Sequence, residues 1–265
     1  MRLRVYCLAP AATFFGAFWL LPAARLIALP AEKGWQTYFA VLTDSHYWWS
    51  LVNTLLLSAT VTVVTLVLGA AVGIFLARTP FVGNRILLGI LTLPLSFPGV
   101  IIGFFMILLG GRQGLIAQVS DDLGLGRVTL AYGLPGLFLA YLYFSLPRAI
   151  STYHAAAQAM DPALEEAACS LGAQGWPIVR DVWIAELAPT TLACAAVIFA
   201  TAMGAFGTAF TLASKVEVLP ISIYNAFTNY ADFATAAALS LSLGLVTWFV
   251  LFLGRKLDAS VMETR

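Results

Sequence analysis

The chain has 265 residues, of which 61% are hydrophobic and only 10% are charged, and its formal net charge is +1. A soluble domain usually carries about 25% charged residues, so this composition excludes an ordinary water-soluble domain. The small net charge and the lack of a basic cluster give no indication of nucleic acid binding.

Six apolar stretches are long enough for a membrane-spanning helix, which needs about 20 apolar residues. Each is apolar on all sides, whereas barrel strands would alternate polar and apolar residues over about ten positions. The first stretch is interpreted as a retained helix, because it has no clear cleavage site and its apolar run is long for a signal peptide. The sequence therefore predicts an all-α membrane protein, a single permease domain over residues 1–265 with six transmembrane helices at 5–28, 50–77, 86–109, 128–147, 189–212 and 233–254.

Lysine and arginine are distributed unevenly between the two sides of this predicted bundle. With the N-terminus in the cytoplasm, nine of the 14 basic residues lie inside and five lie outside. The inside group is Arg2, Arg4, Arg78, Arg85, Arg148, Arg180, Arg255, Lys256 and Arg265. The outside group is Arg25, Lys33, Arg112, Arg127 and Lys215. Because cytoplasmic loops carry an excess of Lys and Arg, the sequence predicts that both termini are cytoplasmic.

The longest predicted cytoplasmic segment, residues 148–188, joins the fourth and fifth helices. Asp161 is a favourable N-cap and Pro162 suits the first helical position, while Gly172 can adopt the left-handed conformation that ends a helix. We therefore expect a short helix from Pro162 to the residue before Gly172, and a second helix that begins near Pro177. The pair is interpreted as a docking platform at the inner membrane surface. From composition alone, a helix pair that only closes the loop fits equally well.

The same loop carries a spaced motif: Glu166-Ala167-Ala168, three residues, Gly172, nine residues, then Val182-Trp183-Ile184-Ala185. This spacing resembles the Glu-Ala-Ala signature of permease subunits of bacterial ATP-binding-cassette (ABC) importers, in which Gly follows after three residues and Ile-x-Leu-Pro after nine more. Here Ala185 replaces the final proline. The resemblance runs from about Trp49 to the C-terminus, and its further features are Asn53-Thr54, Gly69 and the segment from Pro94 to Pro98.

The resemblance implies a MetI-like type I permease of the bacterial inner membrane that forms half of a solute translocation pathway. It also implies that the loop helix seats in a groove of a cytoplasmic ATPase. The implied partners are two ATPase subunits, a second permease chain that is identical or homologous, a periplasmic or lipid-anchored solute-binding protein, and membrane lipid. The ATPase, rather than this chain, would use ATP and magnesium. The residues assigned to ATPase coupling by the resemblance are Glu165, Glu166, Ala167, Ala168 and Gly172.

The sequence shows no recognisable motif for nucleotide binding, metal binding or catalysis. The phosphate-binding pattern GxxxxGK[S/T] is absent, so we expect no ATPase site, no enzyme activity and no bound cofactor on this chain. The two histidines show no metal-ligand spacing, and the three scattered cysteines (Cys7, Cys169 and Cys194) are interpreted as packing residues. No Asp or Glu lies within a predicted span, which counts against a proton-coupled carrier and an intramembrane hydrolase.

Small and hydroxyl-bearing residues gather in the third and fifth predicted spans. Glycine and proline loosen helices and allow close packing, and hydroxyl groups can line a polar path without a buried charge. Packing between helices explains these residues equally well. The resemblance assigns them to the translocation pathway: Ser96, Pro98, Gly99, Thr201, Gly204, Gly207 and Thr208.

The transported solute is the least constrained property. Residues 204–208, together with Leu219-Pro220 and Ile223-Tyr224, resemble the branch of the family that handles polyamines, ferric iron, sulfate and phosphonates. No residue separates these solutes. An ATP-independent channel or carrier is the alternative function, and a membrane-embedded enzyme is a third hypothesis for which no reactive group of residues is found.

Overall fold

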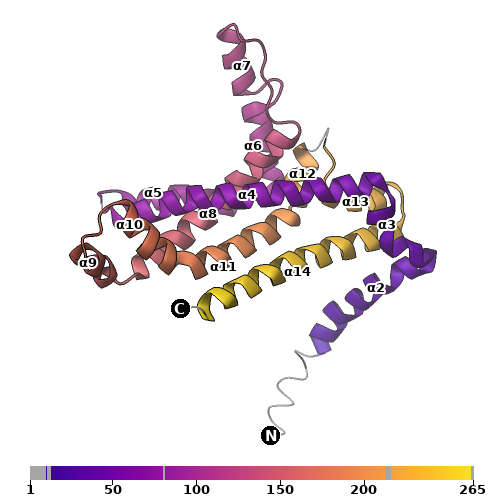
Figure 1. Cartoon of the computed structure of the whole chain (residues 1–265). Helices are drawn as coiled ribbons and strands as arrows, with labels where there is room; N and C mark the ends of the chain where they lie inside the picture. Colours follow the sequence, from indigo (N-terminus) through magenta and orange to yellow (C-terminus); the bar gives the residue numbers. More distant parts are fainter. Residues whose placement is uncertain (1–9, 11–12, 80, 213–215, 264–265) are drawn as a thin grey trace. The chain divides into compact units, whose positions relative to one another are not determined.

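A computed structural model describes residue 10 and residues 13–79, 81–212 and 216–263. Every regular element in these residues is a helix (Figure 1), in agreement with the all-α prediction. The described residues form two compact units. One contains the residues up to Asn53 together with 217–246, and the other contains 54–216 together with the residues from Thr247 onward.

The first unit joins the N-terminal helices to the segment that leads into the last helix. Lys33 Nζ contacts Asp232 Oδ2 at 2.5 Å, and Asp232 Oδ1 accepts a hydrogen bond from the Thr235 amide at 3.1 Å. Burial raises the pKa of Asp232, but hydrogen bonds from Lys33 and Thr235 outweigh it, so the net pKa lies below the ordinary value of 3.8. The elements of this unit are η1 (Gly16–Leu20), α2 (Leu21–Lys33), η2 (Trp35–Phe39), α3 (Ala40–Thr43), the start of α4 (Ser45–Arg78), α13 (Leu219–Tyr224), η5 (Asn225–Asn229) and most of the first half of α14 (Phe233–Glu263).

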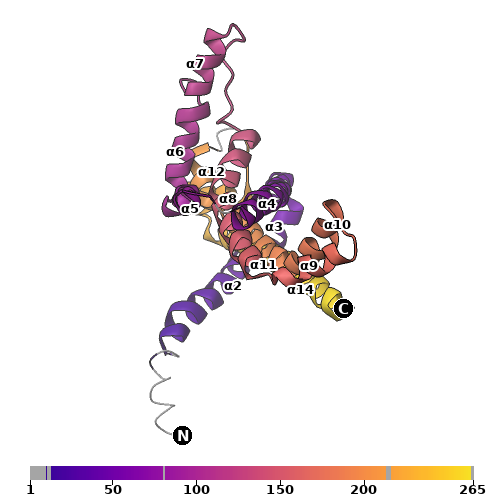
Figure 2. The same cartoon turned by 90° about the vertical axis from the view of Figure 1, so that its left-hand side faces the viewer.

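The second unit contains the remaining helices. Both views place α7 at the far end of α6, away from α9 and α10 (Figures 1 and 2). Besides the rest of α4 and α14, its elements are α5 (Asn84–Thr92), η3 (Leu93–Ser96), α6 (Gly99–Gly110), α7 (Leu115–Asp122), α8 (Leu134–Ala159), α9 (Pro162–Ser170), α10 (Trp176–Ile178), η4 (Val179–Trp183), α11 (Ile184–Met203) and α12 (Phe206–Leu212).

Helix α8 packs tightly against α4 because glycines remove the side chains between the two backbones. A Cβ on Gly73 would lie 2.7 Å from the Ile150 carbonyl oxygen and 2.9 Å from Tyr153 Cβ. Gly69 lies one turn earlier in α4, and a Cβ added there would collide with the Ala149 side chain. Small residues four apart on one face are a common way for membrane helices to approach closely. Tyr153 continues the contact to α11 through its hydroxyl, which donates to Thr191 Oγ1 at 2.9 Å.

Five helical segments of the described residues are long and apolar enough to cross a membrane. They are Thr13–Lys33, Ser45–Arg78, Gly99–Asp122, Trp176–Met203 and Phe233–Gly254. The first, second and last overlap the predicted spans at 5–28, 50–77 and 233–254, and residues 5–9, 11 and 12 of the first predicted span lie outside the described residues. Residue Lys215, assigned to an outer loop, also lies outside them.

Three predicted spans differ from the observed helices. The third, 86–109, is interrupted between α5 and α6, because Pro98 has no amide hydrogen to donate and its ring forces Phe97 into an extended conformation (φ −97°, ψ 133°). The fifth, 189–212, breaks at Gly204 and Ala205, between α11 and α12. The fourth, 128–147, begins later, at Leu134, and continues for 12 residues beyond Pro147 to Ala159.

Candidate functional site: the α9 face and the polar cavity

Helix α9 begins at the predicted Pro162 and ends at Ser170, one residue before the predicted end. Asp161 caps its N-terminus, where the Oδ1 atom accepts a hydrogen bond from the Ala163 amide at 2.9 Å, and Pro162 is the first helical residue. After the last turn Gly172 has φ +89°, a conformation that favours glycine. The Ala173 amide then donates to the Ala168 carbonyl at 3.0 Å, which closes the turn. The direction of α9 is therefore set by capping at both ends.

Glu165 connects α9 to two other helices. Its Oε1 atom contacts Arg78 Nη2 at 2.5 Å and accepts a hydrogen bond from Trp183 Nε1 at 2.9 Å. The Arg78 guanidinium also lies over the Trp183 ring, 5.9 Å from the centroid. About one quarter of each charged side chain is exposed, at 25% for Arg78 and 26% for Glu165. We name this group of three residues the α9 lock, because it ties the C-terminal end of α4 to α9 and to η4, the helical segment that precedes α11.

The lock divides the five predicted coupling residues into two groups. Glu165 faces the protein and Ala168 is partly buried, whereas Glu166, Ala167 and Gly172 are exposed. Large apolar side chains lie exposed beside the outer group. We call this outer surface the α9 face, and its members are Leu164, Glu166, Ala167, Leu171, Gly172 and Trp176.

Sequence reasoning missed the roles of Arg78 and Trp183. Arg78 was used only as a charge at the boundary of a span, and nothing in the local sequence connects it to a glutamate 87 positions later. The second loop helix also differs from expectation. It begins at Trp176, next to the predicted Pro177, but continues through η4 into α11 without a break. Ala185 retains the amide hydrogen that a proline would lack, so the helix can continue through this position.

The predicted pathway residues gather around one cavity of about 400 Å³. It lies among η3, α6, α8 and the turn from α11 to α12. Five of the seven predicted residues line it, namely Gly99, Thr201, Gly204, Gly207 and Thr208. Ser96 and Pro98 are exposed next to it and are not part of its lining. That the seven residues line a translocation pathway stays a prediction.

Two of these residues also hold the cavity wall together. Thr208 Oγ1 donates to the Gly99 carbonyl at 3.0 Å, which ties α12 to the start of α6. A Cβ on Gly207 would lie 3.1 Å from a methyl group of Val100, so this glycine has a packing role as well. At Gly204, by contrast, the nearest atom to an added Cβ is 3.7 Å away. A larger side chain at Gly204 therefore probes the cavity with the least disturbance of the wall.

Arg148 is a charged member of the cavity that sequence reasoning placed at the start of a loop. It lies in the interior of α8, about 21 Å along the helix from Leu134 at 1.5 Å per residue. Its Nη1 atom donates to Thr201 Oγ1 at 3.0 Å. A guanidinium in a partly buried position normally has a polar or charged partner, because burying an uncompensated charge is costly. The helix itself continues past this residue, because α8 ends only at Ala159.

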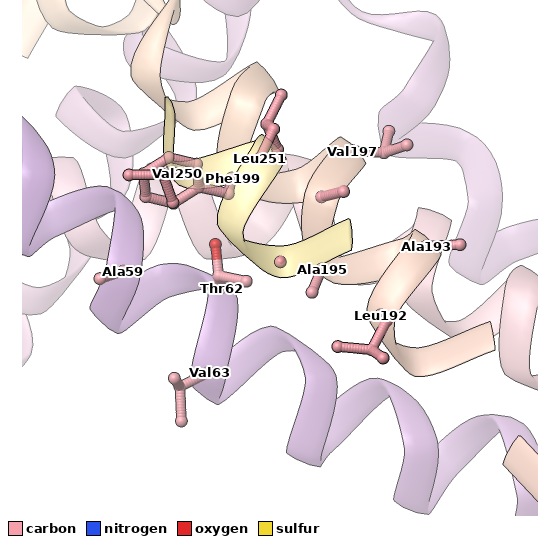
Figure 3. A pocket seen from close by; sticks show the side chains of 12 residues that line it. Ala59, Thr62, Val63, Leu192, Ala193, Ala195, Val197, Phe199, Val250 and Leu251 are labelled. Carbon is pink, nitrogen blue, oxygen red and sulfur yellow. The ribbon is translucent and has the colours of Figure 1, made fainter. Parts of the chain in front are cut away.

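A second cavity, of about 570 Å³, lies among α4, α11 and α14 (Figure 3). Its lining is almost entirely alanine, valine, leucine and phenylalanine. The Thr62 hydroxyl already donates a hydrogen bond to the Ser58 carbonyl oxygen at 2.7 Å. This cavity offers little to a polar solute and suits hydrocarbon. Among the described residues, no group of three or more His, Cys, Asp or Glu side chains could hold a metal ion.

Two solved structures are similar to this fold. The first is a bacterial alginate ABC transporter in complex with an alginate pentasaccharide-bound periplasmic protein. The alignment has a TM-score of 0.83 and 18% identity, and it covers 98% of this chain and 94% of that one. The second is the MetNI methionine ABC transporter in an inward-facing conformation, with a TM-score of 0.63, 20% identity, and coverage of 83% and 99%. At these identities the similarity establishes the fold.

Curated relatives are similar over most of this chain. The chain is 28% identical over 242 residues to sulfate permease 2 of Chlamydomonas reinhardtii, covering 88% of this chain but 65% of that longer protein. It is 28% identical over 239 residues to the sulfate transport system permease protein CysW of Synechocystis, covering 88% and 85%. It is 27% identical over 218 residues to the molybdenum transport system permease protein ModB of Escherichia coli, covering 79% and 93%.

A protein-family model matches residues 69–262, which is most of the chain. This region includes α9, its lock partners Arg78 and Trp183, and the whole polar cavity. The family match, the fold and the curated relatives agree with one another. The chain therefore belongs to the family of binding-protein-dependent transport system inner membrane components.

Proposed function

We propose that this permease forms half of the translocation pathway of an ABC importer and that a separate ATPase docks on the α9 face. The observation that carries this proposal is the α9 lock. An exposed helix with large apolar side chains is held in one orientation by a partly buried ion pair. A helix that only closed a loop would need no such attachment. By resemblance, Glu166, Ala167 and Gly172 make the contact, and Glu165 with Ala168 supports them from behind.

The membrane arrangement that we propose has six spans and cytoplasmic termini. Helix α8 supplies the sixth span in addition to the five apolar segments. Its 26 residues extend about 39 Å at 1.5 Å per residue, which exceeds the roughly 30 Å hydrocarbon core. Residues 134–147 contain no charge, and Arg148 alone interrupts the apolar character of the following turn. This arrangement keeps α9 on the cytoplasmic side, in one permease domain.

The partners follow from this arrangement. Two ATPase subunits, a second permease chain and a periplasmic or lipid-anchored binding protein complete the importer in the bacterial inner membrane. ATP and magnesium would be used by the ATPase, since this chain lacks a phosphate-binding loop.

A tetrahedral oxyanion, sulfate or molybdate, is the solute that we propose. Two kinds of relatives support this choice, because their names are those of sulfate and molybdenum permeases. Within the described part of the chain, the one charged side chain that lines the polar cavity is positive, which favours an anion over a polyamine or ferric iron.

Co-purification and uptake test the proposed function. The chain is purified in mild detergent with its partners, reconstituted in proteoliposomes, and assayed for ATP-dependent uptake of radiolabelled sulfate and molybdate. We expect a co-purifying ATPase that is lost with Glu166→Lys and retained with Glu186→Lys, an exposed carboxylate outside the α9 face. Uptake that continues after ATP depletion would favour an ATP-independent channel or carrier instead.

A further inference from the structure

Among the residues that the structure describes, Arg148 is the only charged side chain that lines the polar cavity. None of the ion pairs in the described part of the chain involves it. Its side chain makes one hydrogen bond to the described residues, from Nη1 to Thr201 Oγ1. A guanidinium has five N–H donors, so most of them remain available to a molecule in the cavity.

The other polar side chains of the cavity are already engaged. Thr201 Oγ1 donates to the Val197 carbonyl at 2.6 Å, and Thr208 Oγ1 donates to the Gly99 carbonyl at 3.0 Å. The remaining lining is apolar side chain, glycine and backbone. A cation would therefore meet a like charge with no carboxylate to offset it, whereas an anion would meet an unpaired guanidinium.

The geometry points to a transient oxyanion site, in which Arg148 receives the tetrahedral oxyanion inside the membrane; this inference rests on the proposed function. The planar guanidinium can donate two parallel N–H bonds to two oxygens of one anion. Thr201 orients the guanidinium by accepting from Nη1, so that the other nitrogens face the cavity. Arg148 is thus the binding residue, and Thr201 is a positioning residue.

The proposed site also suits an anion that must move on through the membrane. Conduction needs binding that is favourable enough for entry but weak enough for release. One arginine meets this need better than a closed cage of donors. The cavity, at about 400 Å³, has room for water molecules beside the anion, so the anion need not lose its whole hydration shell.

A purely structural role for Arg148, in which it only fastens α8 to α11, makes a different prediction. Two variants separate the alternatives because they act on the link in opposite ways. Arg148→Gln removes the charge and shortens the side chain, so it weakens the hydrogen bond to Thr201. Thr201→Asp keeps Arg148 and strengthens the link, but its carboxylate neutralises the guanidinium. If Arg148 is only a fastener, Thr201→Asp is tolerated. If Arg148 receives the anion, Thr201→Asp fails.

The test uses the reconstituted complex with its ATPase and binding protein, and measures uptake of sulfate and of molybdate together with ATP hydrolysis. We expect uptake to fall about tenfold or more in both variants, the effect of losing one charge-assisted hydrogen bond. Arg148→Lys should retain part of the uptake, and Arg85→Gln, which removes an exposed charge outside the cavity, should be normal. Assembly with the ATPase should persist in Thr201→Asp.

The outcomes are distinct. Normal uptake by Thr201→Asp overturns the oxyanion site, and so does an Arg148→Gln complex that transports as well as Arg85→Gln. If Arg148→Gln does not assemble, Thr201→Asp alone decides. A wild-type complex that hydrolyses ATP but imports neither anion overturns the proposed substrate and, with it, this site. Wild-type import with unaffected variants overturns only the site.

Discussion

Breaking the α9 lock should weaken ATPase docking without affecting membrane insertion. Glu165→Gln keeps an oxygen that can accept from Trp183 Nε1 but removes the charge that faces Arg78. Glu165→Ala removes both interactions. No apolar span is altered in either variant, so the chain should insert at the wild-type level. What changes is the fraction of molecules in which α9 has the orientation that the ATPase recognises.

The magnitude follows from the geometry of the lock. Exposed ion pairs contribute about 0–1 kcal/mol, and hydrogen bonds to charged groups about 1.5–3 kcal/mol. Since both charged side chains are about one-quarter exposed, at 25% and 26%, we take about 1–2 kcal/mol for the ion pair and about 1 kcal/mol more for the Trp183 bond. Each 1.4 kcal/mol is tenfold, so ATPase affinity should fall up to about thirtyfold for Glu165→Gln and up to about 150-fold for Glu165→Ala.

A titration of the purified ATPase against the permease in detergent measures this effect. Glu186→Gln is the matched control, because it removes an exposed carboxylate that has no ion-pair partner among the described residues. A double-mutant cycle with Arg78→Met isolates the pair, and we expect a coupling energy of about 1–2 kcal/mol. Unchanged affinity in Glu165→Ala, or additive effects in the cycle, would refute the idea that the lock orients α9.

Three further predictions concern single positions. Gly172→Val should cost about 1–2 kcal/mol in local conformation and weaken ATPase association in pull-down, whereas Gly124→Val, with similar strain at φ +72°, should leave association normal. Gly73→Ala should lower thermal stability by about 1–3 kcal/mol through overpacking, while Gly89→Ala, which has open space around its Cβ, should be neutral or stabilising. The lowered pKa of Asp232 means that its carboxylate stabilises the fold above about pH 4, and this stabilisation is lost as the pH falls through the folded-state pKa. Melting curves between neutral and acid pH should show this loss in wild type and not in Asp232→Asn.

The all-α class and the family could be predicted from the sequence, because both depend on local patterns. Long apolar runs imply spanning helices wherever they occur, and the spacing between Glu166 and Gly172 is a property of a single loop. The same holds for α9, whose N-cap at Asp161 and left-handed residue at Gly172 lie within one short segment. The limits of the third and fifth spans were less well predicted, since Pro98 and Gly204 interrupt apolar runs that composition treats as continuous.

By itself, the sequence determined that this chain is a helical membrane permease with an ordered loop helix, because hydropathy, capping and motif spacing act over neighbouring residues. Only the tertiary structure decided what the charged residues do. Arg78 and Glu165 meet because the fold brings the C-terminal end of α4 to α9, and Arg148 lines the polar cavity because α8 continues beyond Pro147. Distances between residues far apart in sequence depend on how the helices pack, and a charge alone does not reveal whether it ends a helix or lies inside one.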